Sequence, residues 1–358
     1  EDLRARTLYL STQRIRGFDP ARVGDVPSSQ ALQRIYEGLV QVSYLDRPYR
    51  VEPLLAEALP EVSADGLLYT FRLRRGLLFQ DDPCFPGGRG REVTAADVAY
   101  SLKRIADRKL ASTGWWAFRE RIAGLDEFRE RSAGDAPTDY EQPVAGLQVM
   151  DRYTIRIGLT GPYPQLLWVL ALHYGSVVPR EAVEFYGERF SSHPVGTGPY
   201  VLKAWSRNYR IEFERNPAWR ASGRADAYPS TGGEGDAAAG LLADAGRPLP
   251  MIDRIVSYVV ADPATQWLMF LTGQLDEADI ARDNWSVVVD GSGQLVPALR
   301  ERGVRLSVAP QLRITYIGFN MDDPRVGRNA ALRQAMTCAF NSDEWVRLNN
   351  GRVRRATG

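Results

Sequence analysis

The sequence predicts an α/β protein made of two lobes, and three observations carry this prediction. The chain has 358 residues, more than one compact hydrophobic core usually organises. Segments with the period-two apolar pattern of strands alternate along it with segments of helical spacing. Hydrophobic residues make up 44% of the chain and charged residues 25%, values typical of a folded globular protein.

The clearest early elements lie in the first half of the chain. Residues Leu68–Arg74 alternate large apolar residues with Thr and Arg, the pattern of a half-buried strand. A turn region rich in Asp, Pro and Gly follows at Phe79–Gly90. Thr94 then begins a helix, because Asp97 stands three residues later, as in a capping box, and apolar residues follow at helical spacing. Residues 152–159 predict a further strand.

The second half continues the alternation around one irregular segment. Between residues 221 and 250, small, polar and glycine residues prevail, which predicts a flexible surface insertion. Three strands are predicted in this half, at residues 200–205, 210–215 and 252–260. Helices are expected from Asp262 and over Asn329–Phe340.

Charge and hydropathy exclude several classes of function. The formal net charge is +1 and acids are interspersed with bases, which argues against a nucleic-acid-binding protein. The longest apolar run, Leu166–Leu172, is too short to cross a bilayer. The chain begins with polar residues, so no signal peptide is predicted there. A cytosolic protein and a mature or trimmed exported protein both stay open.

The side chains that usually carry catalysis or bind metals show no recognised spacing. Cys84 and Cys338 lie far apart and give neither a disulfide framework nor a metal motif. His173 and His193 also lack a ligand spacing and are predicted to be structural. The sequence has no phosphate-binding Gly-Lys-Ser/Thr motif and no Gly-x-Ser-x-Gly elbow. We therefore predict no catalytic residue, metal site or cofactor, and do not expect an enzyme.

Eight short motifs occur in an order typical of one family. They are Phe18–Pro20, Ile35–Leu39, Pro53–Ala58, Tyr69–Gly76, Val93–Arg104, Val195–Tyr200, Phe213–Pro217 and Leu332–Ala335. Together they resemble the extracellular solute-binding proteins of the peptide/nickel class, family 5 of the ABC importers. From Gly318 to Arg352 the sequence is most similar to oligopeptide-binding members of the YejA type.

The resemblance implies a two-lobed periplasmic-binding-protein fold of type II, with ligand enclosed between lobes joined by crossing strands. It places the main part of lobe I at residues 1–35 and 160–257, and an extra subdomain of lobe I at 36–159. Residues 258–358 would begin lobe II. Family members continue beyond the position of Gly358, so the chain is expected to be incomplete at its C-terminus.

The resemblance also implies a function in transport. The protein would be the substrate-binding component of an ABC importer, capturing oligopeptides by hinge closure and delivering them to membrane permease subunits. We expect a monomer in the periplasm or another extracytoplasmic space, either free or lipid-anchored, with no nucleic-acid partner. Three alternatives stay open. They are the same fold binding a metal chelate, oligosaccharide or opine-like compound, a hydrolase of peptides or glycans, and a sensory protein.

By the resemblance, the glycine-rich segment before the strand at residue 200 lies at the lobe I wall of the cleft, and it supplies the first candidate binding residues: Gly196, Thr197 and Gly198. Glycine lets backbone groups approach an extended ligand without interference from a Cβ atom. A peptide bound through its main chain, like an added strand, would use such sequence-neutral hydrogen bonds. The alternative is a plain tight turn.

The resemblance supplies the other candidates. Gly24, Asp25 and Val26 match a first-lobe loop that touches the peptide backbone, although a solvated loop is the alternative. Trp115 and Trp116 would offer flat apolar surface to varied side chains, unless they belong to the core.

A further set of candidates lies in the second lobe. Tyr316, Gly318 and Asn320 are predicted on a strand that faces the ligand, alternating with buried Ile317 and Phe319. Which of the two sets faces the cleft stays open.

Overall fold

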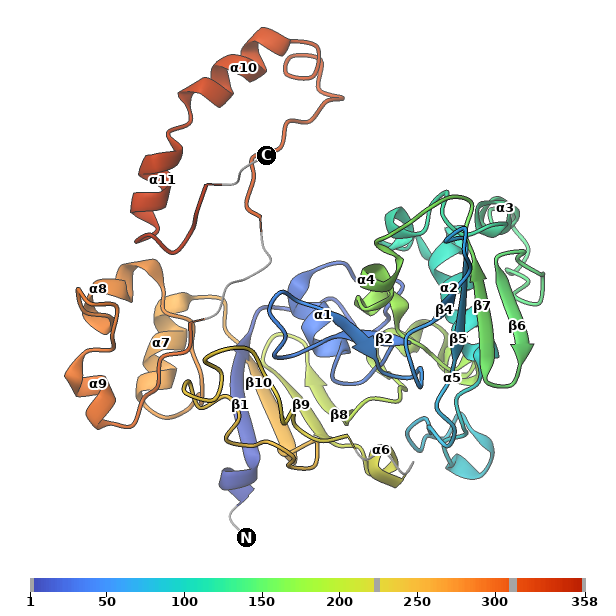
Figure 1. The fold of residues 1–358 in the computed structure, drawn as a ribbon, viewed down its shortest axis with the longest axis horizontal. Coiled ribbons are helices and arrows are strands. Elements are labelled where there is room, and N and C mark those ends of the chain that lie inside the picture. Colours follow the sequence, from blue (N-terminus) through green and yellow to red (C-terminus); the bar gives the residue numbers. More distant parts are fainter. Residues whose placement is uncertain (1–2, 222–225, 309–313, 356–358) are drawn as a thin grey trace. The chain divides into compact units, whose positions relative to one another are not determined.

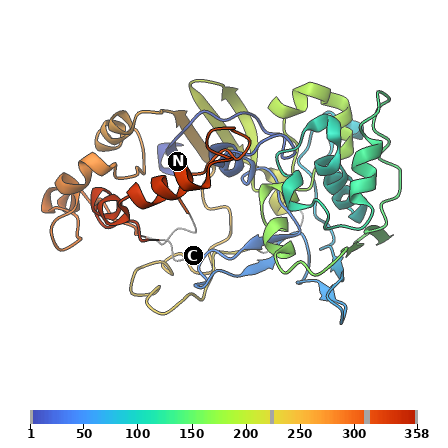
Figure 2. The ribbon, with the colours of Figure 1, turned by 90° about the horizontal axis from the view of Figure 1, so that it is seen from above.

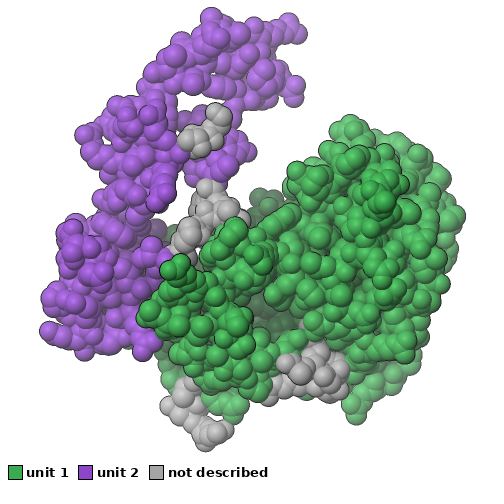
Figure 3. Space-filling view, viewed as in Figure 1, with its two compact units in different colours: residues 1–262, 272–277 green, residues 263–271, 278–358 purple. Residues whose placement is uncertain are grey.

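The computed structural model describes residues 3–221, 226–308 and 314–355 (Figure 1). The chain divides into two compact units, which Figure 3 shows in different colours. Unit 1 comprises Glu1–Asp262 and Thr272–Glu277, and unit 2 comprises Pro263–Leu271 and Ala278–Gly358. The chain therefore passes between the units three times.

Unit 1 contains a mixed four-stranded sheet with the strand order β1-β10-β9-β8. The strands are β1 (Thr7–Thr12), β10 (Arg254–Val259), β9 (Arg210–Arg215) and β8 (Tyr200–Ser206). β1 and β10 are parallel, and the other neighbours are antiparallel. Ile211, Phe213 and Val256 are buried in the core. The three strands predicted for the second half of the chain are confirmed.

A second, antiparallel sheet has the order β4-β5-β7-β6. Its strands are β4 (Glu61–Val62), β5 (Leu68–Arg72), β7 (Thr154–Gly158) and β6 (Leu147–Asp151). Helices α2 (Ala95–Ala106) and α3 (Leu125–Arg131) pack against each other, and α2 packs on β6 and β7. Seen from above, α2, α3, β6 and β7, coloured teal and green, lie together on the right of the view (Figure 2). The predicted strands here are confirmed, whereas a separate subdomain at 36–159 stays a prediction.

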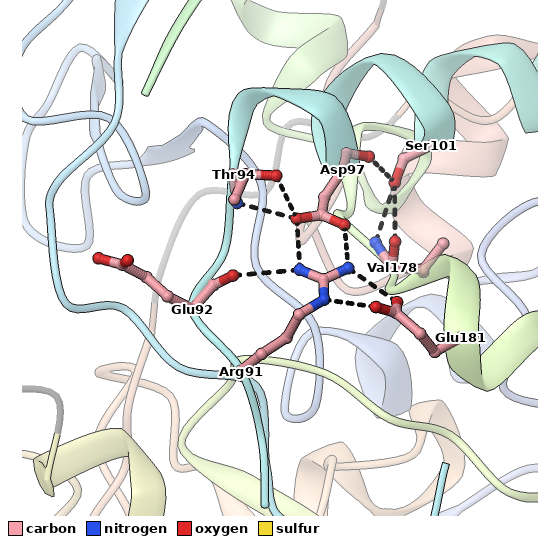
Figure 4. A network of polar contacts seen from close by, with 7 residues as sticks. All are labelled: Arg91, Glu92, Thr94, Asp97, Ser101, Val178 and Glu181. Atoms are coloured by element: carbon pink, nitrogen blue, oxygen red, sulfur yellow. Dashed lines mark hydrogen bonds and ion pairs between the residues drawn. The ribbon is translucent and has the colours of Figure 1, made fainter. Parts of the chain in front are cut away.

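The start of α2 is fixed by a network of charged groups (Figure 4). Both the N–H and the hydroxyl of Thr94 donate to Asp97 Oδ2, at 2.8 and 2.9 Å. The Arg91 guanidinium donates to both oxygens of Asp97 and to both oxygens of Glu181. Because Glu181 lies in α5 (Arg180–Tyr186), Arg91 joins two helices that are distant in sequence.

The remaining helices of unit 1 are short. They are α1 (Val26–Leu32), α4 (Leu166–Leu170) and α6 (Pro217–Ala221). α1 is capped by Asp25, whose Oδ1 accepts from the Ser28 N–H at 2.9 Å. A hairpin of β2 (Val40–Val42) and β3 (Val51–Pro53) completes the regular structure.

In its described part, residues 226–250, the predicted insertion consists of turns and an isolated antiparallel bridge between Ala227 and Pro248. It is attached to the rest of unit 1 by an ion pair between Asp226 and Arg74 (3.1 Å) and by contact of the Tyr228 and Tyr44 rings. Residues 222–225 of the predicted insertion lie outside the described residues. Its flexibility stays a prediction.

Residues 272–277 bring the chain back to the open edge of β1. The Asp276 N–H donates to the Tyr9 carbonyl at 2.8 Å, and the Tyr9 N–H donates to Asp276 Oδ2 at 2.6 Å. Arg4 donates to the other carboxylate oxygen of Asp276 at 3.0 Å. This short segment therefore occupies the side of β1 that β10 leaves unpaired.

The described part of unit 2 is helical. Its helices are α7 (Pro263–Leu271), α8 (Trp285–Val288), α9 (Pro297–Glu301), α10 (Ala330–Ala339) and α11 (Ser342–Leu348). Its small core contains Val288, Val289, Leu295 and Leu299. Asn329 caps α10 by accepting from the Leu332 N–H at 2.9 Å. The helices predicted near residues 262 and 329 are confirmed.

The strand predicted around Tyr316 is not formed. Residues 314–320 are irregular, Tyr316 is 81% exposed and Ile317 is 70% exposed, so the predicted burial of Ile317 is wrong. Phe319 is half-buried, while Gly318 and Asn320 are exposed. A strand needs a neighbour to pair its backbone groups. Among the described residues of unit 2, strand pairing is limited to an isolated bridge between Val289 and Leu295, so an alternating sequence alone does not produce a strand here.

Candidate ligand-binding site

Helix α1 (Figure 1) lies between two of the predicted binding segments. Its N-terminus carries Asp25 and Val26. Just beyond its C-terminus, the Ile35 carbonyl accepts from the Gly198 N–H at 2.7 Å. The loop at residues 24–26 and the glycine segment at 196–198 thus lie at opposite ends of one short helix.

The glycine segment is buried, and its glycines are explained by a close approach within the protein. A Cβ atom on Gly196 would lie 2.1 Å from the Ile35 oxygen, and one on Gly198 would lie 2.6 Å from the Ile35 carbonyl carbon. Gln80 N–H and Asn216 Nδ2 donate to the carbonyls of Gly196 and Gly198, at 2.9 and 2.8 Å. We predicted that glycine is needed here because a ligand lies close to the backbone. In the structure, glycine is needed because the backbone of Ile35 lies close to it. A ligand contact here stays a prediction.

Thr197 differs from the two glycines beside it. Only 2% of the residue is exposed, and its hydroxyl has no hydrogen-bond partner among the described residues. A buried polar group without a partner costs free energy. The Thr197 hydroxyl therefore keeps an unused donor and acceptor beneath the surface.

The loop at residues 24–26 meets the segment that precedes the paired tryptophans. Thr113 Oγ1 donates to the Val23 carbonyl at 2.7 Å, and a Cβ atom on Gly24 would lie 3.0 Å from the Thr113 side chain. Val26 is 69% exposed and Trp116 is 64% exposed. The loop at residues 24–26 thus contacts Thr113, which stands two residues before Trp115 in the sequence.

Trp115 is half-buried and faces a different environment. The Arg129 guanidinium lies over its indole ring, 4.7 Å from the centroid. An open cavity of about 400 Å³ adjoins the ring, and its other lining residues are Arg108, Arg119, Glu120, Asp126, Arg129 and Glu130. These charges pair with one another, for example Arg108 with Glu130 at 3.1 Å. The cavity is therefore polar, and the charges of its lining residues neutralise one another.

His173 lies beneath the loop at residues 24–26, and its place there was not predicted. Its ring nitrogens Nε2 and Nδ1 lie 2.9 Å from the Val23 carbonyl and 3.0 Å from Ser29 Oγ. Burial lowers the pKa of His173, against the smaller opposing effects of the Val23 carbonyl and Asp25. Since His173 and Val23 stand far apart in sequence, no local pattern signals this contact.

A second buried cluster centres on Asp82, next to the glycine segment. Asp82 accepts hydrogen bonds from His193 Nε2 (2.9 Å), the Tyr186 hydroxyl (2.8 Å) and the Cys84 N–H (2.9 Å). Burial alone would raise the pKa of Asp82, but these donors outweigh it and the pKa is lowered. Burial and the neighbouring Asp82 both raise the pKa of the Cys84 thiol, which makes it a poor nucleophile. The cluster is suited to holding His193 in place.

Two further properties describe the chain as a whole. Among residues 3–221, 226–308 and 314–355, no three His, Cys, Asp or Glu side chains are grouped so that they could hold a metal ion. Within the same ranges, no helix combines the length and the apolar character needed to span a membrane.

The remaining candidates, Tyr316, Gly318 and Asn320, lie in unit 2. They are exposed on an irregular segment, and their contact with a ligand stays a prediction.

Comparison with known proteins identifies the class of protein that this fold and site represent. Residues 50–358 match the family of bacterial extracellular solute-binding proteins, family 5, and the chain belongs to that family. Among curated proteins, the chain is similar to the glutathione-binding protein GsiB of Salmonella choleraesuis. The two are 26% identical over 336 residues, covering 92% of this chain and 51% of the relative. The family expected from the eight motifs is confirmed.

Solved structures show the same fold. Listeria monocytogenes OppA bound to peptide matches with a TM-score of 0.59 and 20% identity, covering 78% of this chain and 47% of that one. A periplasmic oligopeptide-binding protein from Borrelia burgdorferi matches with a TM-score of 0.61 and 22% identity, covering 79% and 49%. The predicted fold class is confirmed. The chain spans about half the length of the curated relatives it matches.

Proposed function

We propose that the whole protein is the substrate-binding component of an ABC importer, and that it captures oligopeptides through the loop at residues 24–26. One observation carries this proposal. Gly24 is exposed, and within the described part of the chain neither its N–H nor its C=O makes a hydrogen bond. The N–H of Asp25 is unused in the same way. Free backbone groups on an exposed loop can receive the main chain of an extended peptide.

Two exposed apolar side chains belong to this loop and to the segment that it contacts: Val26 lies in the loop, and Trp116 stands three residues after Thr113. Val26 and Trp116 can pack against peptide side chains, and the flat indole suits residues of varied shape. Main-chain hydrogen bonds combined with such a surface favour broad specificity. Glutathione, which the curated relatives bind by name, is itself a tripeptide and is therefore a suitable test ligand.

Family membership supports a proposal for the partners and location of the whole protein. The family is described as extracellular, which supports a place outside the cytoplasm. We extend the proposal to a monomer, free or lipid-anchored, that passes its ligand to the transmembrane subunits of a permease after closing around it.

Native mass spectrometry on the gently purified intact protein is the first test of the ligand class. A ladder of peptide masses, released on denaturation, is expected. A single non-peptide mass would replace oligopeptides as the ligand and leave the binding role in place. If nothing co-purifies, calorimetric titration with glutathione and mixed tri- to pentapeptides decides, and no binding to any of them contradicts the proposal.

Substitution of the exposed indole tests the location of the site. Trp116→Ala is expected to weaken peptide binding about tenfold, as loss of an aromatic anchor commonly does. Tyr209→Ala is the matched control, because Tyr209 is 58% exposed in the turn between β8 and β9. Equal affinities for the two variants would place the site elsewhere.

A further inference from the structure

The Val23 carbonyl is held by two side chains from different parts of the chain. Thr113 Oγ1 donates to it at 2.7 Å, and His173 Nε2 lies 2.9 Å from it. A carbonyl oxygen has two lone pairs, so these two donors use its full capacity. Val23 and His173 are both buried, at 2% and 7% exposure. The carbonyl is therefore fixed toward the interior.

Fixing this carbonyl also fixes the N–H that follows it. The Val23 C=O and the Gly24 N–H belong to one planar, trans peptide unit, in which the two groups point in opposite directions. When the carbonyl points inward to His173 and Thr113, the Gly24 N–H points away from them. That N–H has no partner among the described residues, and Gly24 is exposed. The two hydrogen bonds that hold the Val23 carbonyl inward therefore leave the Gly24 N–H pointing outward as a free donor.

The hydrogen bonds also specify the protonation of the imidazole. A carbonyl can only accept, so Nε2 of His173 must carry a proton. In the neutral ring Nδ1 then accepts from the Ser29 hydroxyl, 3.0 Å away in α1. His173 in this tautomer joins both ends of the segment from Val23 to Ser29.

We propose that His173 is a positioning residue for ligand capture: as the neutral Nε2–H tautomer, and together with Thr113, it holds the loop at residues 24–26 so that the Gly24 N–H faces the peptide. This inference rests on the proposed function and names the internal device that prepares the site. His173 itself touches no ligand.

The electrostatic surroundings of His173 are consistent with a neutral ring. Burial is the largest influence and lowers its pKa. Asp25 is the charged group that opposes this effect, and its carboxylate is paired with exposed Arg16 at 3.7 Å. The Tyr174 ring lies against the imidazole, with a centroid distance of 3.9 Å.

Binding measurements on the intact protein test the proposal, using glutathione or a tripeptide shown to bind the wild type. Thr113→Val removes one donor at nearly constant volume and is expected to raise Kd about 3- to 10-fold, the effect of one lost hydrogen bond. His173→Phe removes the other donor and keeps a planar aromatic ring at this position, and peptide affinity is expected to fall about tenfold or more. His173→Gln, which can return an N–H to the Val23 carbonyl, should recover part of that loss.

Control measurements separate positioning from general stability. Tyr153→Phe removes a hydroxyl that donates to Glu92 at 2.8 Å, away from the loop. It is expected to lower the melting temperature without changing Kd. If Tyr153→Phe raises Kd as much as Thr113→Val does, the effect is only structural and the proposal is wrong.

A nitrogen-15 correlation spectrum of the imidazoles reads the tautomer directly. The chain has only 2 histidines, so the spectrum of His193→Gln assigns the His173 signals. A neutral ring with the proton on Nε2 is expected at neutral pH. An Nδ1–H tautomer or an imidazolium would overturn the inference, even if the variants bind poorly.

The outcomes distinguish this inference from the proposed function. If the wild type binds no peptide, the proposed function fails and the inference fails with it. If the wild type binds peptide and both Thr113→Val and His173→Phe bind equally well, only the inference fails.

Discussion

At the scale of single residues, a buried ion pair anchors the approach to the candidate site. Arg104 donates to both oxygens of Asp19, at 3.0 and 2.9 Å, and both side chains are 4% exposed. Asp19 also accepts from the Ala21 N–H at 3.1 Å. The ion pair joins α2 to the segment that leads into Val23. It therefore holds the start of that segment next to α2.

Breaking this pair should be costly. Arg104→Met leaves the buried Asp19 carboxylate with only the longer ion pair to Arg22 (3.7 Å), and we expect it to reduce the free energy of unfolding by about 3–5 kcal/mol. Arg119→Met, which removes an exposed pair with Glu120, should cost only about 0–1 kcal/mol. Urea unfolding of the two variants makes the comparison. Similar losses would show that burial of the Asp19 pair has no special consequence.

Gly198 is a second residue whose role is set by one neighbour. An added Cβ would meet the backbone of Ile35 and Arg34, at 2.6 and 2.8 Å, and backbone atoms cannot move aside as a side-chain end can. Gly198→Ala should therefore lower the free energy of unfolding by about 1–3 kcal/mol. Gly134→Ala is the control, because nothing lies within 4 Å of its added Cβ. Equal midpoints in urea would contradict the steric explanation.

At the scale of elements, α2 is well specified by its own sequence. The Thr94 N–H and hydroxyl both donate to Asp97, so the first turn of the helix is closed by residues three apart. Thr94→Ala is expected to cost about 0.5–2 kcal/mol of unfolding free energy, and Thr94→Ser to recover most of it. Thermal unfolding followed by circular dichroism measures both. No recovery by serine would mean that the methyl group, not the hydroxyl, stabilises the turn.

Elements that depend on local signals could be predicted, whereas those that depend on distant partners could not. The capping box of α2 and the alternation in β5 are local, and both are present in the structure. In β9 the strand is present but its burial does not alternate, because Glu212 is buried between Ile211 and Phe213. The alternation at 314–320 looked similar but has no neighbouring strand to pair with among the residues that the structure describes. Alternation of apolar and polar residues predicts which face of a strand would be buried. It does not predict whether a partner strand is present.

The candidate site shows the same division. The glycines at 196 and 198 were recognised from sequence, but the backbone that requires them lies at Ile35. His173 was predicted to be structural, and its contact with Val23 depends on how separate segments meet. A site formed by contacts between segments that are distant in sequence cannot be assigned from the spacing of residues within one segment.

At the scale of the whole molecule, two carboxylates make stability depend on pH: Asp82, which is buried, and Glu181, which is partly exposed. Burial would raise the pKa values of Asp82 and Glu181, but hydrogen bonds from His193 to Asp82 and from Arg91 to Glu181 outweigh it and lower both. When folding lowers the pKa of a carboxyl group, that group stabilises the folded protein at pH values above its pKa in the unfolded chain. This contribution to stability is lost as the pH falls through the pKa of the group in the folded protein.

Acid unfolding should therefore begin below the ordinary carboxyl pKa values of 3.8 and 4.5. We expect the free energy of unfolding to fall as the pH is lowered through this range, and Asp82→Asn to show a shallower fall than the wild type. Urea titrations at a series of pH values measure the slope. The same slope in both proteins would mean that Asp82 is equally acidic when folded and unfolded.

The return of residues 272–277 to β1 has a consequence for association between molecules. β1 is the outer strand of its sheet, and an uncovered outer strand is a template on which another chain can add its own strand. Asp276 engages both backbone groups of Tyr9, in the middle of this 6-residue strand, and adds a negative charge there. An incoming strand would have to displace that carboxylate before it could pair continuously along β1. Residues 272–277, which link stretches of the two units along the chain, therefore also hinder the addition of a foreign strand to this edge of the sheet.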